Sequence, residues 1–130
     1  MKRLCFVTVV LALVGGLTVL SGRAADKKDS LMRKKLQHSQ KVLEGVALGD
    51  FKMISTNAEE LIDISKAAEW KAIRSPRYEV YSNEFRRIAD ALAKKAREKN
   101  LDGAALSYVE LTLTCVRCHK HVREIRMVRR

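Results

Sequence analysis

The sequence predicts an all-α protein, an antiparallel four-helix bundle with up-down-up-down topology. Apolar residues recur at steps of three and four over four segments, which is the period of an amphipathic helix. The connections between these segments are short, and short connections make neighbouring helices antiparallel. One proline and 5% aromatic residues fit poorly with an all-β fold, and a length of 130 residues indicates one domain.

The N-terminal segment has the layout of a secretory signal peptide. A short positively charged start precedes an apolar run over residues 4–20, and small residues follow at Gly22 and Ala24. We expect cleavage after Ala24, so that residues 1–24 are removed and residues 25–130 form the mature domain. The alternative is an uncleaved membrane anchor, because this run is at the lower edge of the length that spans a bilayer.

The expected helices cover residues 31–48, 51–73, 77–99 and 104–127. Gly49 ends the first helix and Asp50 caps the second. Pro76 separates the second helix from the third, because the residue before a proline is disfavoured in a helix. Residues 100–103 form the last loop, with Asp102 as the candidate cap. The residues expected on inward faces are Met32, Leu36, Ser39, Leu43 and Val46; Phe51, Ile54, Ala58, Leu61, Ile64 and Ala68; Tyr81, Phe85, Ile88, Leu92 and Ala96; Tyr108, Leu111, Cys115, Cys118, Val122 and Ile125.

One motif carries chemistry: residues 115–119 read Cys-Val-Arg-Cys-His. Cys-x-x-Cys-His is the signature of covalent haem attachment. On a helix, Cys115 and Cys118 share a face, so both sulfurs can reach the two vinyl groups on one edge of a porphyrin. His119 follows one turn after Cys115, as a proximal iron ligand would. The motif therefore predicts one covalently bound haem c, and the expected export agrees with attachment outside the cytoplasm.

Other uses of the two cysteines fit less well. A zinc site would combine Cys115 and Cys118 with His119, His121 or His38, but adjacent Cys and His residues are poorly spaced for a tetrahedral site. A thioredoxin-like pair is expected at the start of a helix in a βαβ unit. A disulfide between residues three apart on a helix is sterically awkward.

The signal segment, the four helices and a single haem motif near the C-terminus together resemble the class II c-type cytochromes, the cytochrome c′ family. The specific match is confined to residues 115–123, because in this family a basic residue typically follows the histidine by four positions, here Arg123. The resemblance implies that residues 25–130 form a four-helix haem domain. It also implies a sixth iron position that is either open beside an apolar residue or filled by a methionine from the first helix.

The first helix offers candidates for that sixth position. In an antiparallel arrangement its start lies beside the end of the last helix, near His119. Met32 is the candidate thioether ligand, and Leu36 is the alternative, as an apolar wall of an open site. We expect His38 and His121 to lie on the solvent-exposed surface.

The charge balance adds an expectation about partners. There are 26 Lys and Arg residues against 15 Asp and Glu, a net charge of +11, and loss of three basic residues with the signal peptide lowers it to +8. Basic residues concentrate near the C-terminus, at Arg117, Lys120, Arg123, Arg126, Arg129 and Arg130. This end is suited to haem propionates and to an acidic redox partner, and the alternative is a solvated basic surface without a partner. Nucleic acid is not expected, membrane contact is expected only if residues 1–24 are retained, and a homodimer is left open.

These observations predict an exported, periplasmic monohaem c-type cytochrome that carries one electron and is not an enzyme. The alternative is a haem protein with an open distal site that binds nitric oxide or carbon monoxide. A peroxidase-like enzyme is the weakest hypothesis, because the inward stripe of the first helix offers no distal acid–base pair.

Overall fold

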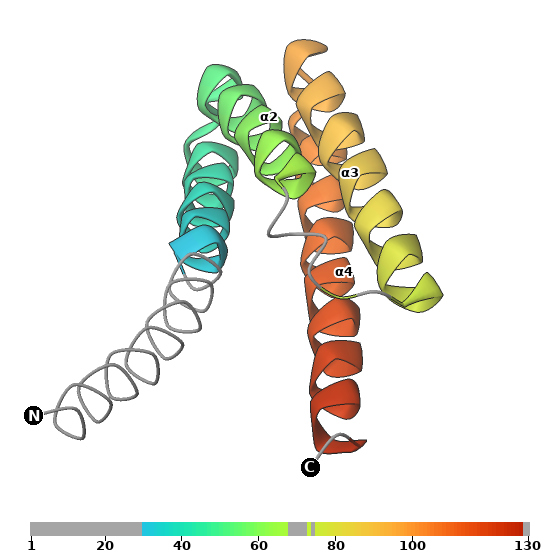
Figure 1. The fold of residues 1–130 in the computed structure, drawn as a ribbon. Coiled ribbons are helices and arrows are strands. Elements are labelled where there is room, and N and C mark those ends of the chain that lie inside the picture. Colours follow the sequence, from blue (N-terminus) through green and yellow to red (C-terminus); the bar gives the residue numbers. More distant parts are fainter. Residues whose placement is uncertain (1–29, 68–72, 74, 129–130) are drawn as a thin grey trace, which may run out of the picture.

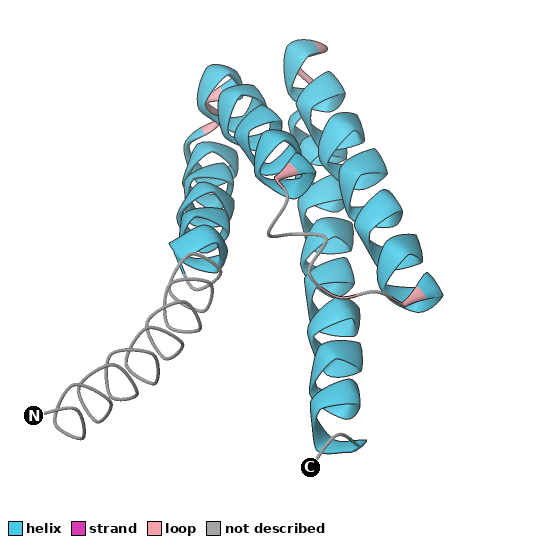
Figure 2. Cartoon of the chain, in the orientation of Figure 1, coloured by secondary structure: helices cyan, strands magenta, loops and turns pink. Residues whose placement is uncertain are grey.

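The computed structural model describes residues 30–67, 73 and 75–128, and every regular element among them is a helix (Figures 1 and 2). The first helix covers residues 30–48 of the described chain. It is followed by α2 (Phe51–Lys66), α3 (Pro76–Arg97) and α4 (Leu101–Val128). The described part of the chain has four helices and no strand, so the predicted all-α class is confirmed and the arrangement is compatible with a four-helix bundle.

The first connection begins and ends as the sequence predicts, and the second ends beside Pro76 as expected. Gly49 has a φ of 68°, a left-handed conformation that suits a residue without a Cβ, and it ends the first helix. The carboxylate of Asp50 accepts a hydrogen bond of 2.9 Å from the backbone N–H of Met53 and so caps α2. The hydroxyl of Ser75 does the same for Tyr78 at 3.1 Å. Pro76 is therefore the first residue of α3, where its missing N–H costs no hydrogen bond.

Two predicted boundaries are wrong. α2 ends at Lys66 instead of about Ile73, because the backbone of Ala67 is extended and Ile73 itself lies in a bend. The predicted inward residue Ala68 lies outside the described residues. α4 begins at Leu101, and its cap is Asn100, whose side-chain oxygen accepts a hydrogen bond of 2.8 Å from the N–H of Gly103.

The core is built around α3, which packs against both α2 and α4 (Figure 1). Its members are mostly aliphatic and small: Val42, Ile54, Ala58, Leu61, Tyr78, Phe85, Ile88, Ala89, Leu92, Ala93, Ala96, Ala104, Leu111 and Cys118. The expected inward stripes of α2 and α3 are all buried or packed against this core, apart from Ala68.

The first helix is rotated relative to its predicted orientation. Lys35 and Val42, which are seven residues apart, are buried, whereas Leu36 and Leu43 are exposed. One position along a helix changes direction by more than a quarter of a turn, so the core-facing line lies one residue earlier than expected. Gly45 allows α2 to approach this helix closely, since a Cβ there would lie 2.9 Å from Cγ1 of Ile54.

Candidate functional site

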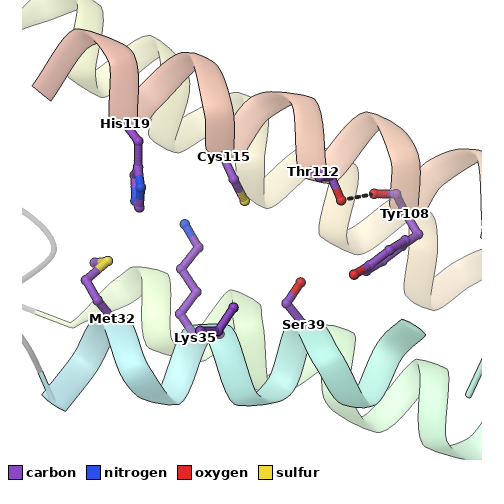
Figure 3. A pocket seen from close by; sticks show the side chains of 8 residues that line it. Met32, Lys35, Ser39, Tyr108, Thr112, Cys115 and His119 are labelled. Atoms are coloured by element: carbon purple, nitrogen blue, oxygen red, sulfur yellow. Dashed lines mark hydrogen bonds between the residues drawn. The ribbon is translucent and has the colours of Figure 1, made fainter. Parts of the chain in front are cut away.

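A cleft of about 240 Å³ lies between the first helix and α4. Its lining is mostly apolar and comes from both helices: Met32, Lys35, Leu36 and Ser39 from the first, and Tyr108, Thr112, Cys115 and His119 from α4 (Figure 3). Met32 lies toward the His119 end, and Ser39 toward the Tyr108 end (Figure 3). The two helices therefore run antiparallel along the cleft, and the predicted proximity of the start of the first helix to His119 is confirmed.

The helical period separates the motif residues between the cleft and the core. Cys115 and His119 are one turn apart, and both line the cleft. Cys118 is buried and belongs to the core cluster that also holds Leu111. Both cysteines are free thiols.

Lys35 is the cleft residue that sequence reasoning missed. Its side chain is only 8% exposed and reaches from the first helix toward α4, between His119 and Cys115 (Figure 3). The ammonium nitrogen lies 4.1 Å from the centroid of the Phe85 ring, within the range of a cation–π contact. Lysines are almost never buried without a partner, and the charge pattern of the sequence gave no reason to place this one inside.

Burial and charge shift the proton affinities of the site. Burial lowers the pKa of Lys35, against the opposing effect of Cys115 and Cys118. His119 has an exposed side chain, yet the surrounding atoms desolvate it enough to lower its pKa, and the positive charges of Lys35 and Arg123 lower it further. The neutral imidazole, which is the form that binds metals, is therefore favoured.

The side chains of Cys118 and Tyr78 both have raised pKa values. Burial raises the pKa of the Cys118 thiol; nearby Lys35 lowers it, and Cys115 raises it. Burial also raises the pKa of Tyr78 to about 12, with a contribution from Cys118. Since the thiolate is the reactive form of cysteine, Cys118 is the less reactive thiol in the folded chain.

The remaining predicted residues lie outside the cleft. Arg123 is exposed, one turn beyond His119 on α4. The prediction of a solvent-exposed His38 is wrong, because its side chain is half-buried and its Nδ1 lies 3.0 Å from Oδ1 of Asn57 on α2. The prediction of a solvent-exposed His121 is wrong, because its Nε2 lies 3.1 Å from Oγ of Ser75 and its ring packs edge-on against Tyr81.

The basic end of α4 carries less unpaired charge than the sequence indicated. Arg117 forms an ion pair of 2.8 Å with Glu84 of α3. Arg123 and Arg126 are exposed, while Arg129 and Arg130 lie outside the described residues. The positive surface next to the cleft is therefore centred on Lys120 and Arg123.

The donor set of the cleft fits a haem better than an isolated metal ion. An attached haem needs two thiols and one imidazole on the same helix. Cys115 and His119 supply one thiol and the imidazole on the cleft face, whereas the second thiol, that of Cys118, is buried in the core. Among residues 30–67, 73 and 75–128, no group of three or more His, Cys, Asp or Glu side chains is placed to hold a metal ion. The cleft is slightly smaller than the usual 300–1,000 Å³ of ligand pockets, so a porphyrin would have to displace the Lys35 side chain.

No family model, curated protein or solved structure matches this chain. Within the described residues, no helix is both long enough and apolar enough to cross a bilayer.

Proposed function

We propose that this protein is an exported monohaem c-type cytochrome that carries one electron between partner proteins. The observation that carries the proposal is the position of Cys115 and His119, which face a mostly apolar cleft opposite Met32 and Leu36. A haem c bound there would supply a one-electron couple at iron. We also propose that residues 25–130 form an up-down-up-down four-helix haem domain of the cytochrome c′ type.

Each residue of the motif has a defined role in this proposal. The sulfurs of Cys115 and Cys118 form the thioether bonds, and His119 is the proximal iron ligand through its neutral imidazole. Because Cys118 is buried in the core, its bond would form before α4 packs against α3. Met32 is the proposed sixth ligand, since it lies in the cleft near the end of α4 that holds His119.

The exposed basic residues beyond the cleft support the proposed redox partner. Lys120 and Arg123 lie next to His119 on α4, where positive charge can neutralise haem propionates and steer an acidic protein toward the haem edge. Export to the periplasm rests on the segment over residues 1–24, which lies outside the described residues.

Binding of a small gas is the second candidate function, and one observation favours it. Leu36 lines the cleft and is exposed, as an apolar side chain beside an open sixth position would be. In that case nitric oxide or carbon monoxide would bind on the side of the first helix. The absorption spectrum separates the two functions, because a thioether ligand gives low-spin iron with a sulfur-to-iron charge-transfer band, whereas an open site gives high-spin ferrous iron that binds carbon monoxide.

The proposal is tested by attachment of haem to the polypeptide. The protein is produced in a host with intact haem-attachment machinery, denatured, separated on a gel and stained for haem. We expect a stained band for the wild type and none for Cys115→Ala with Cys118→Ala. Val116→Ala is the matched control, because it changes an exposed position between the two cysteines and leaves the motif intact. A wild-type protein without covalent haem would overturn the proposal.

A further inference from the structure

Lys35 brings a cationic side chain into an otherwise mostly apolar cleft. The side chain is 8% exposed, and it reaches from the first helix toward α4, between His119 and Cys115 (Figure 3). The ammonium nitrogen lies 4.1 Å from the centroid of the Phe85 ring on α3, and Phe85 is itself only 2% exposed. The positive charge is therefore held inside the molecule, in contact with the core.

The lining of the cleft favours an anion over a cation. None of the described residues that line it is Asp or Glu. Burial lowers the pKa of Lys35, and the groups that oppose this shift are the thiols of Cys115 and Cys118. Both thiols are consumed when the proposed thioether bonds form, so the cleft of the haem protein keeps the lysine and loses these two ionisable groups.

Lys35 and the proposed proximal ligand come from opposite sides of the cleft. His119 belongs to α4, whereas Lys35 lies on the first helix, three residues after Met32. The inference therefore rests on the proposed function, in which His119 binds the iron and the sixth position faces the first helix. The Lys35 side chain has to yield to a porphyrin, but its backbone belongs to the first helix, so the ammonium stays on that side. Its flexible four-carbon stem allows it to reach a ligand there.

Two further residues of the first helix suit a small ligand. Ser39 lies one turn after Lys35, and its hydroxyl is directed into the cleft (Figure 3). Leu36 lines the cleft and is 59% exposed, so the cleft is open to solvent on this side. A small ligand that enters from solvent therefore meets an ammonium and a hydroxyl, both of which donate hydrogen bonds.

We propose that Lys35 makes the first-helix side of the haem a binding site for a small inorganic anion. The ammonium donates a charge-assisted hydrogen bond to a negatively charged ligand, and it gives no comparable advantage to a neutral ligand such as carbon monoxide. A hydrogen bond to a charged group changes affinity by about 10- to 100-fold. Lys35 therefore selects ligands by charge, which an apolar open site would not do.

The test compares two small ligands of different charge on the mature haem protein. Azide is titrated into the ferric form and carbon monoxide into the ferrous form, and both dissociation constants are measured from the absorption spectrum. All proteins carry Met32→Ala, because an anion at the sixth position would otherwise compete with the proposed thioether ligand. We expect Lys35→Met to weaken azide binding by about 10- to 100-fold and to change carbon monoxide binding by less than about twofold.

Two more variants separate the charge of Lys35 from its shape and its surroundings. Lys34→Met is the matched control, because Lys34 is the exposed neighbour with the same charge, and this variant should bind azide like its parent. Lys35→Gln keeps a polar hydrogen-bond donor without the charge, and it should lose most of the azide affinity that Lys35→Met loses. Circular dichroism shows whether each variant is folded.

Three results would contradict this role of Lys35 in a protein that carries haem. The first is an azide affinity that Lys35→Met leaves unchanged. The second is a parallel loss of azide and carbon monoxide affinity, which would mean that the substitution changes the shape of the site. The third is a low-spin ferric spectrum without azide that Lys35→Met abolishes, which would make the lysine itself an iron ligand. A protein without covalent haem on the gel would instead overturn the proposed function, and this inference with it.

Discussion

The buried Lys35 makes a quantitative prediction about stability. The substitution Lys35→Met replaces the ammonium with an apolar group of similar length in a site that is 8% exposed. Folding of the wild type removes a charged amine from water, and the cation–π contact with Phe85 offsets about 0.5–2 kcal/mol of that cost. Replacement even of buried ion pairs by well-packed apolar side chains is often neutral or stabilising, by up to about 4 kcal/mol. We expect Lys35→Met to raise the free energy of unfolding by about 1–3 kcal/mol.

The lowered pKa of Lys35 also predicts how the stability difference between the wild type and Lys35→Met changes with pH. Because burial lowers the pKa of Lys35 in the folded chain, the unfolded chain binds more protons at pH values between the folded pKa and the ordinary value of 10.5. The stability of the wild type therefore rises with pH relative to that of Lys35→Met, and the gap closes as the pH approaches 10.5.

The assay is chemical denaturation of the haem-free protein. It is expressed without residues 1–24, so that it stays in the cytoplasm, and unfolding is followed by circular dichroism at several pH values. Lys34→Met is the matched control, because Lys34 is the exposed neighbour on the same helix and its replacement should change stability by less than about 0.5 kcal/mol. Destabilisation by Lys35→Met would refute the burial argument. So would a difference in the free energy of unfolding between the wild type and Lys35→Met that does not change with pH. A confirmed cost would mark Lys35 as a residue kept for function and not for stability.

Three further predictions concern the cleft and the core beneath it. If Met32 is the sixth ligand of the proposed haem, Met32→Ala converts low-spin iron to high-spin iron and lowers the reduction potential. If the site is open, Met32→Ala leaves the absorption spectrum unchanged and Leu36→Ala binds carbon monoxide faster than the wild type. In the reduced haem-free protein, an alkylating reagent should label Cys115 faster than Cys118, as measured by mass spectrometry; equal rates would contradict the burial of Cys118. Because the pKa of Tyr78 is raised to about 12 in the folded chain, only the unfolded chain ionises this phenol between pH 10 and about 12. The free energy of unfolding of the wild type should therefore fall by about 2–3 kcal/mol relative to that of Tyr78→Phe over this range. Alkaline denaturation curves that coincide for the two proteins would exclude this effect.

The helix boundaries show how far local sequence signals reach. Gly49, Asp50 and Pro76 act through their own backbone and side-chain chemistry, so the ends that they define were predictable. The end of α2 at Lys66 has no such signal, since Ala67 is a good helix former.

The inward faces show a similar division. In α2 and α3 the apolar period matches the buried residues, because each helix has one wide apolar stripe. In the first helix the same period was compatible with two neighbouring lines, one through Leu36 and Leu43 and one through Lys35 and Val42. The line through Leu36 and Leu43 has more apolar residues and was therefore predicted to face the core. In the structure the line through Lys35 and Val42 is the buried one.

The sequence by itself determined the helical class, the turns at Gly49, Asp50 and Pro76, and the Cys115–His119 motif, because these depend on residues close together in the chain. Only the tertiary structure turned Cys118 into the core and buried Lys35 over Phe85. Each of these contacts depends on the rotation of one helix against another. A change of one residue in that rotation moves a side chain from core to cleft, and the helical period leaves it undetermined.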